Sequence, residues 1–186
     1  KGGFAGMERA RLEAMFNVNA RAPMLLAHAL LPRLQARASG GIIFTGSVEG
    51  EAPYPFSAVY AATKAFVHGL GMSLYGELAG TGVDVLVLAP GATDTDAITL
   101  QGFKRELMPG LMPPAEVAKQ ALRQLGKVPL HVMGAENRKY VSMLRRMPRE
   151  KLIAFTAQAM SAAIAASARS CVWPGPFTST IWPHRA

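Results

Sequence analysis

Tyr60 and Lys64 are the two residues of this chain whose types and spacing best fit an acid–base site. They lie four positions apart in residues 59–66, a segment of helical character, so both side chains project from one face of a helix. A tyrosine hydroxyl titrates near pH ~10, and a neighbouring ammonium favours the phenolate. The spacing therefore predicts that Lys64 lowers the pKa of Tyr60 and makes it a general acid–base. A surface lysine beside a half-buried tyrosine gives the same pattern. The accompanying motifs therefore have to decide between an acid–base pair and a structural one.

Three further motifs accompany this pair in a defined order along the chain. A short apolar run of buried-strand character ends at Ser47, and a second run over residues 83–89 breaks at a Pro-Gly turn. An apolar-periodic stretch of helical character precedes both runs. The residues of these motifs that could take part in chemistry are Asn17, Asn19, Ser47, Pro90, Gly91 and Thr95.

Taken together, the ordered motifs resemble the second half of a short-chain dehydrogenase/reductase, over about residues 16–134. The resemblance implies NAD or NADP as cofactor and hydride transfer between the nicotinamide and an alcohol or carbonyl carbon of a small molecule. Tyr60 matches the acid–base of that family, and Lys64 matches the lysine that also holds the nicotinamide ribose hydroxyls. Ser47 matches the serine that orients the substrate oxygen, since its hydroxyl both donates and accepts.

The remaining motif residues also have counterparts in the family. Asn19 matches the asparagine that anchors a water in the proton relay to the lysine, whereas Asn17 fits the spacing less well. Pro90, Gly91 and Thr95 match the turn that contacts the nicotinamide carboxamide and phosphates. In this interpretation Gly91 lets the backbone approach a ligand closely.

The sequence departs from the family pattern in two places. Gly46 stands where the family often has a second serine, a change expected to be harmless. The glycine-rich turn that follows the first strand and binds the pyrophosphate is missing, and residues 1–6 read as a loop entering the first helix. The sequence therefore predicts a catalytic half-site in a fragment of a longer enzyme. The alternative is a truncated, catalytically silent dehydrogenase-like interaction module.

The expected fold is α/β, a partial, doubly wound, parallel, Rossmann-like sheet with C-terminal helices. Strands are predicted over 42–45, 83–89 and 128–133, the last at an edge because of Pro129. Helices are predicted over 8–37 with a kink at Pro23, 57–79, 113–125 and 137–168 with a break near Pro148. The loop 48–57 and residues 91–112 are expected to be irregular. The predicted division is a dehydrogenase half over 1–134, a basic helical extension over 135–170 and an irregular tail over 171–186.

Composition and charge limit the compartment and the binding partners that we expect. The chain has 186 residues, half of them hydrophobic, with a single cysteine, which predicts one globular domain in the reducing cytoplasm. Thirteen of its 20 lysines and arginines follow residue 100, without a nucleic-acid recognition motif. We expect a solvated cationic face, with weak contact to a membrane surface after Arg138 as the alternative. Helices 8–38 and 57–79 are expected to pair in a homo-oligomer, as in the family.

Other polar residues suggest less. The four histidines lack ligand spacing, so no metal site is expected. Glu49 and Glu51 flank the Ser47 loop and are expected to be solvated.

The segment where the family places its substrate lid is apolar, which predicts an apolar substrate. Its residues are Phe103, Leu107, Met108, Leu111 and Met112.

Overall fold

The computed structural model describes residues 1–100, 103, 105 and 110–168, and its described sheet has three parallel strands. These are β1 (Gly40–Thr45), β2 (Val83–Ala89) and β3 (Leu130–Val132), in the spatial order β1-β2-β3. Thr45 is paired with Leu88, and Ala89 with Val132. All but one of the β2 side chains are buried, as expected for a central parallel strand covered on both faces. The predicted α/β class and parallel sheet are confirmed.

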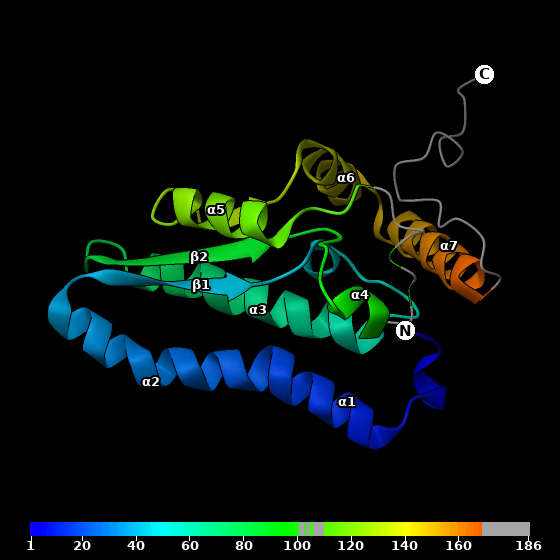
Figure 1. Ribbon diagram of the computed structural model, residues 1–186, viewed down its shortest axis with the longest axis horizontal. Helices are drawn as coiled ribbons and strands as arrows, with labels where there is room; N and C mark the ends of the chain where they lie inside the picture. Colours follow the sequence, from blue (N-terminus) through cyan, green and yellow to red (C-terminus); the bar gives the residue numbers. More distant parts are fainter. Residues whose placement is uncertain (101–102, 104, 106–109, 169–186) are drawn as a thin grey trace.

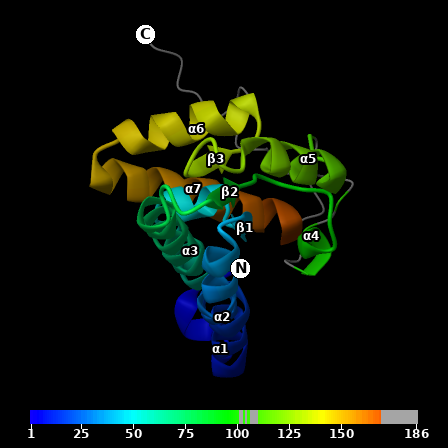
Figure 2. The same cartoon turned by 90° about the vertical axis from the view of Figure 1, so that its left-hand side faces the viewer.

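Helices cover both faces of the sheet (Figure 1). One face packs against α2 (Ala22–Arg37) and α3 (Ala58–Glu77) in a cluster that includes Phe44, Val67 and Val85. The opposite face packs against α5 (Pro114–Gln124), with Leu86, Leu88 and Ala121 in a second cluster. Viewed along the strands in Figure 2, α2 and α5 lie on opposite sides of the sheet. Alternate residues of β2 therefore supply the two halves of the core.

The first helix is divided, where the sequence predicted a single one kinked at Pro23. The α-helix α1 (Arg9–Phe16) passes into a π-helical turn η2 (Asn17–Arg21) before α2 begins at Ala22. Pro23 lies in the first turn of α2. Its ring nitrogen carries no hydrogen, so it cannot donate to the carbonyl of Asn19 four residues earlier. This missing donor explains why the regular α-helical pattern is interrupted at η2.

One predicted boundary was wrong, and two stretches expected to be irregular contain short helices. Strand β1 begins at Gly40, because Gly40 and Gly41 pair with Val83 and Asp84 rather than forming a turn. The loop after β1 contains a 3₁₀ helix, η3 (Val48–Glu51), capped by the side chain of Ser47. The stretch after β2 contains the short helix α4 (Ala97–Leu100).

The C-terminal helices are α6 (Ala135–Arg146) and α7 (Arg149–Ala168), separated at Pro148 as predicted. They pack against the loop after η3 and the start of α3 in a cluster that includes Tyr54, Ala61, Tyr140, Leu144 and Met160. The Tyr54 and Tyr140 hydroxyls lie 3.0 Å apart, and Thr156 Oγ1 donates to the carbonyl of Pro53 at 2.8 Å. Helices α6 and α7 thus cover the loop that follows Ser47.

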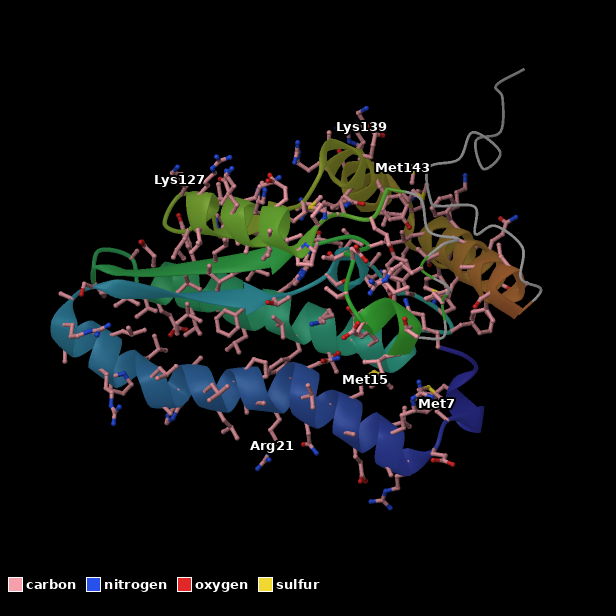
Figure 3. The ribbon with its side chains drawn as sticks, viewed as in Figure 1. Met7, Met15, Arg21, Lys127, Lys139 and Met143 are labelled. Carbon is pink, nitrogen blue, oxygen red and sulfur yellow. The ribbon has the colours of Figure 1, made fainter. Side chains whose placement is uncertain are left out.

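The outer faces of the helices carry much of the charge. Figure 3 shows the side chain of Lys139 on α6 and that of Arg21 pointing away from the body of the molecule. Within the described ranges, no helix combines the length and the apolar character needed to cross a membrane. The predicted tail over 171–186 lies outside the described residues.

Candidate active site

The predicted site residues gather where β1 and β2 end. Ser47 follows β1, and Pro90 follows β2 directly. Two backbone bonds join the strand ends, from Gly46 N to Leu88 O (2.7 Å) and from Val48 N to Pro90 O (3.1 Å). The carboxyl ends of neighbouring parallel strands are where open α/β sheets bind ligands.

Tyr60 reaches this edge from the first turn of α3, and its hydroxyl lies close enough to the side chain of Ser47 to interact with it. Burial raises the pKa of Tyr60 above its ordinary value, and the negative charge of Glu49 raises it further, whereas the interaction with the Ser47 side chain opposes both. The pKa of Tyr60 is therefore raised overall, where the spacing to Lys64 predicted a lowered value. At neutral pH Tyr60 carries its proton.

Lys64 lies beside the tyrosine ring rather than at its hydroxyl. Its Nζ is 5.6 Å from the centre of the Tyr60 ring and donates to the carbonyl of Thr45 at 2.8 Å. Burial lowers the pKa of Lys64, because the charged ammonium loses water. The end of β1 thus holds this cation in place next to the Ser47–Tyr60 pair.

Asn19 joins the site through the π-helical turn η2. Its Nδ2 donates to Thr63 Oγ1 at 3.4 Å, and Thr63 Oγ1 donates to the carbonyl of Tyr60 at 2.7 Å. Asn19 therefore lies against the turn of α3 that carries Tyr60 and Lys64. Asn17 is exposed in the same turn, which agrees with the preference for Asn19.

The Pro-Gly turn after β2 is shaped by helix α6. A Cβ added to Gly91 would lie 2.4 Å from Nδ2 of Asn137, which donates to the carbonyl of Met133 at 2.7 Å. Within the described residues, the close approach that requires glycine at this position is to Asn137. Thr95 lies further along the turn and donates to the carbonyl of Thr93 at 3.5 Å.

Glu49 also belongs to the site, although its place in the loop after Ser47 predicted a solvated carboxylate. Glu49 forms an ion pair with the Nζ of Lys1 and accepts from Ser57 Oγ at 2.6 Å, and its backbone N–H donates to Ser47 Oγ at 3.2 Å. The Lys1 Nζ also lies 5.5 Å from the centre of the Tyr60 ring. The available signal was an acidic residue in the first turn of a helix capped by serine, where the helix dipole favours it. No sequence signal pointed to Lys1.

Glu51 was also expected to be solvated, but its side chain is only 6% exposed. It contacts His68 at 3.1 Å and accepts from Arg145 at 2.6 Å. Burial alone would raise the pKa of Glu51, but the hydrogen bonds from His68 and Arg145 outweigh it, so the pKa lies below its ordinary value. The carboxylate is ionised and paired across three segments of the chain.

The expected substrate lid is only partly described. The ring of Phe103 lies 6.0 Å from the Nζ of Lys1, near the site. Met112 instead packs against the core cluster of Leu86 and Met133, so it does not contribute to a lid. Leu107 and Met108 lie outside the described residues.

The described residues fit one end of a dinucleotide. Lys64, Ser47 and Tyr60 place polar groups together where the sheet ends, as a nicotinamide ribose and a substrate oxygen require. In the described sheet, however, β1 is the first strand, and the segment that leads into it is helical. Residues 1–100 and 110–168 therefore hold no strand followed by a glycine-rich turn that could take the pyrophosphate.

Comparison with known proteins identifies the class to which this arrangement belongs. The family model described as short chain dehydrogenase matches residues 1–102, more than half of the chain. The chain therefore belongs to the short-chain dehydrogenase family. This confirms the resemblance drawn from the Ser47, Tyr60 and Lys64 motifs.

Individual relatives within the family are oxidoreductases. A 7beta-hydroxysteroid dehydrogenase of Clostridium sardiniense is 32% identical over 82% of this chain and 59% of its own length. A sulfoacetaldehyde reductase of Chromohalobacter salexigens is 41% identical over 48% of this chain and 36% of its own length. The chain thus spans roughly three fifths or less of these relatives.

Solved structures agree with the fold. A structure from a study of 7beta-hydroxysteroid dehydrogenase stereoselectivity superposes with a TM-score of 0.74 at 26% identity, over 83% of this chain and 62% of that chain. A short-chain dehydrogenase from Sphingobium yanoikuyae in complex with NADPH gives a TM-score of 0.66 at 29% identity, over 78% and 59%. The three-stranded sheet described here is therefore part of a Rossmann-like architecture.

Proposed function

We propose that this chain supplies the catalytic half of an NAD(P)-dependent oxidoreductase acting on an alcohol or carbonyl compound. The observation that carries the proposal is the placement of Ser47, the Tyr60 hydroxyl and the Lys64 ammonium together where β1 ends, with Lys64 Nζ 5.6 Å from the centre of the tyrosine ring. Asn19 adjoins the same helical turn through Thr63. The oxidoreductase relatives support this reading of the site.

The two hydroxyl groups have different tasks in the proposed reaction. Ser47 holds the substrate oxygen, since its hydroxyl can donate to a carbonyl and still accept the N–H of Glu49. Tyr60 gives its proton to that oxygen as the carbonyl carbon is reduced, because its raised pKa keeps it protonated at neutral pH. In the oxidation direction Tyr60 accepts the proton, so alcohol oxidation should require higher pH than carbonyl reduction.

When bound, the cofactor would supply a hydride in its reduced form, NADH or NADPH, for carbonyl reduction, and would accept one as NAD or NADP in alcohol oxidation. Lys64 would hold the ribose hydroxyls of the nicotinamide end, and Pro90, Gly91 and Thr95 would contact the nicotinamide itself. The pyrophosphate-binding turn, and the residue that chooses between NAD and NADP, would come from elsewhere in a longer protein. The described partners of β1 leave one of its edges unpaired, where preceding strands would add.

The proposed substrate is an apolar alcohol or ketone. Phe103 beside the site supports this choice, as does the relative that is named for a hydroxysteroid. Exchange of Phe103 for serine is the matching diagnostic, with KM compared between a bulky lipophilic ketone and a small one. A selective rise for the lipophilic ketone supports the assignment.

The test of the activity is the variant Tyr60→Phe in the protein expressed from its complete coding sequence. We expect turnover to fall by about 10²- to 10⁴-fold, the usual contribution of a positioned acid–base, while nucleotide affinity stays the same. Consumption of NADH and NADPH with a panel of ketones measures turnover, and cofactor fluorescence measures affinity. Tyr75→Phe removes the same hydroxyl further along α3 and is the matched control.

Two outcomes contradict the proposal. Unchanged turnover in Tyr60→Phe would remove Tyr60 as the acid–base. Absence of both turnover and nucleotide binding in the unmodified protein would favour the catalytically silent interaction module.

The proposed partners follow from the exposed faces. Helices α1, α2 and α3 and turn η2 carry large exposed apolar side chains, namely Phe16, Val18, Leu25, Leu26, Leu30, Phe66 and Met72. We assign this apolar face to a homo-oligomer, since exposed apolar patches mark interaction sites. The proposed location is the cytoplasm, with at most weak contact between α6 and a membrane surface and no nucleic-acid partner.

A further inference from the structure

His68 occupies a closely fitting space behind the catalytic serine. It lies on α3 two turns after Tyr60, and its side chain is 5% exposed. A Cβ added to Gly46 would lie 2.3 Å from His68 Nε2, and one added to Gly50 would lie 2.9 Å from His68 Cε1. The imidazole ring therefore fills the space that two glycines leave open, one on each side of Ser47. The glycine at position 46, expected to be a harmless replacement of serine, is what makes room for this ring.

The polar contacts of the ring determine which nitrogen carries its proton. The backbone N–H of Ser47 donates to His68 Nε2 at 3.4 Å, so Nε2 is the acceptor. His68 Nδ1 lies 3.1 Å from Glu51 Oε1. An Nδ1–H group that donates to the carboxylate satisfies both contacts with a neutral imidazole.

Glu51 is itself held from the other side. Its Oε2 accepts from Arg145 Nη2 at 2.6 Å and from Nε at 2.9 Å. A carboxylate with 6% of its side chain exposed requires such partners, because burial of an unpaired charge is costly. The chain of contacts runs from α6 through η3 and α3 to Ser47, which lies just after the end of β1.

Ser47 is thereby fixed at both ends. Its backbone N–H donates to His68 Nε2. Its Oγ accepts the N–H of Glu49 and lies near the Tyr60 hydroxyl. Among the described contacts, no side chain of the motif residues accepts the backbone N–H of Ser47. The position of the serine hydroxyl thus depends on a histidine and a glutamate outside the motif.

We propose that His68 and Glu51 are positioning residues that hold Ser47 in the geometry needed to orient the substrate oxygen. The proposal rests on the proposed oxidoreductase function, since it assigns Ser47 that task. The two residues do not contact the substrate; they act through the backbone of Ser47. Helix α6, by holding Glu51 through Arg145, becomes part of the support of the site.

The test compares His68→Leu with His68→Gln in the protein expressed from its complete coding sequence. Leucine fills much of the space but makes no hydrogen bond, whereas the glutamine amide can accept from Ser47 and donate to Glu51. We expect His68→Leu to lower kcat at least tenfold with the KM for nucleotide unchanged, and His68→Gln to recover most of the loss. Equal kcat in His68→Leu and the unmodified protein would overturn the proposal, as would equal losses in the two variants.

Two measurements keep the test decisive if His68→Leu does not fold. Glu51→Gln preserves the side-chain volume and should also lower kcat; wild-type kcat in this variant refutes the assignment. Proton–nitrogen correlation NMR of the unmodified protein should show His68 protonated on Nδ1 alone. Protonation on Nε2 would refute it, because Nε2 could then not accept from Ser47.

The failure of this proposal can be told apart from failure of the proposed function. If Tyr60→Phe retains turnover, the oxidoreductase assignment fails, whatever the state of His68. If Tyr60→Phe abolishes turnover while His68→Leu and Glu51→Gln retain it, only the positioning proposal fails.

Discussion

Gly71 provides a sharp test of how closely the helix that carries the site must lie to the sheet. It faces β2 from the middle of α3, and a Cβ added there would lie 2.4 Å from Val87 Cγ2 and 3.0 Å from Phe44 Cδ2. Ordinary contacts begin near 3.4 Å, so Gly71→Ala requires about 1 Å of displacement. Val87 is fully buried in the central strand and has little room to move.

The magnitude follows from two opposing effects. Overpacking of a filled core costs about 1–3 kcal/mol, whereas replacing glycine by alanine within a helix gains about 1 kcal/mol. The free energy of unfolding should therefore fall by up to ~2 kcal/mol in Gly71→Ala. Gly69→Ala and Gly76→Ala are matched controls in the same helix, since an added Cβ there meets no heavy atom within 4 Å. These controls should gain about 0.5–1 kcal/mol.

Displacement of α3 should also lower the rate of the proposed reaction. The helix carries Tyr60 and Lys64, whereas Ser47 belongs to the end of β1. Misplacement of reacting groups by ~1 Å can cost about 10²-fold in rate. We expect kcat to fall in Gly71→Ala and to stay unchanged in Gly76→Ala.

Urea unfolding followed by circular dichroism measures the stability difference, and NAD(P)H consumption measures kcat. Equal free energies of unfolding for Gly71→Ala and Gly69→Ala would refute the reasoning. That result would mean that the sheet yields to the added methyl group, and that the close contact of α3 with β2 does not fix the site.

Two further predictions concern charge and association. Glu49→Gln should lower the pKa of Tyr60, because the negative charge that disfavours the phenolate is removed. A titration of tyrosinate absorbance, with the signal of Tyr60→Phe subtracted, measures this pKa. An unchanged or higher pKa in Glu49→Gln contradicts the prediction. Val18→Glu and Leu26→Glu should shift the molecular mass from light scattering to that of the monomer, whereas Leu122→Glu, on the exposed side of α5, should leave it unchanged. An oligomer that survives both changes, or an unmodified protein that is already monomeric, would rule out the apolar face as the interface.

The parallel sheet and the positions of its helices were predictable because their signals are local. Residues 83–89 form one apolar run, and β2 covers the same residues. Pro114 and Pro148 mark helix boundaries through a missing N–H, which acts within one turn of the chain. The spacing of Tyr60 and Lys64 likewise fixed their common helix, since side chains one turn apart share a face.

Tertiary structure decided the electrostatics of the site. The sequence placed Lys64 one turn from Tyr60 and predicted a lowered pKa, but burial and the charge of Glu49 raise it. Glu49 and Lys1 come close to Tyr60 only in the folded chain, and neither is visible in a spacing of four residues.

The sequence by itself determined the class of the fold and the order of the motifs that match the short-chain dehydrogenase family. Only the tertiary structure joined His68 to Gly46 and Glu51 to Arg145, pairs separated by 22 and 94 positions. A glycine next to a serine and a glutamate in a loop carry no local signal of such contacts. These contacts form only when α3 and α6 bring distant side chains into the same small buried volume.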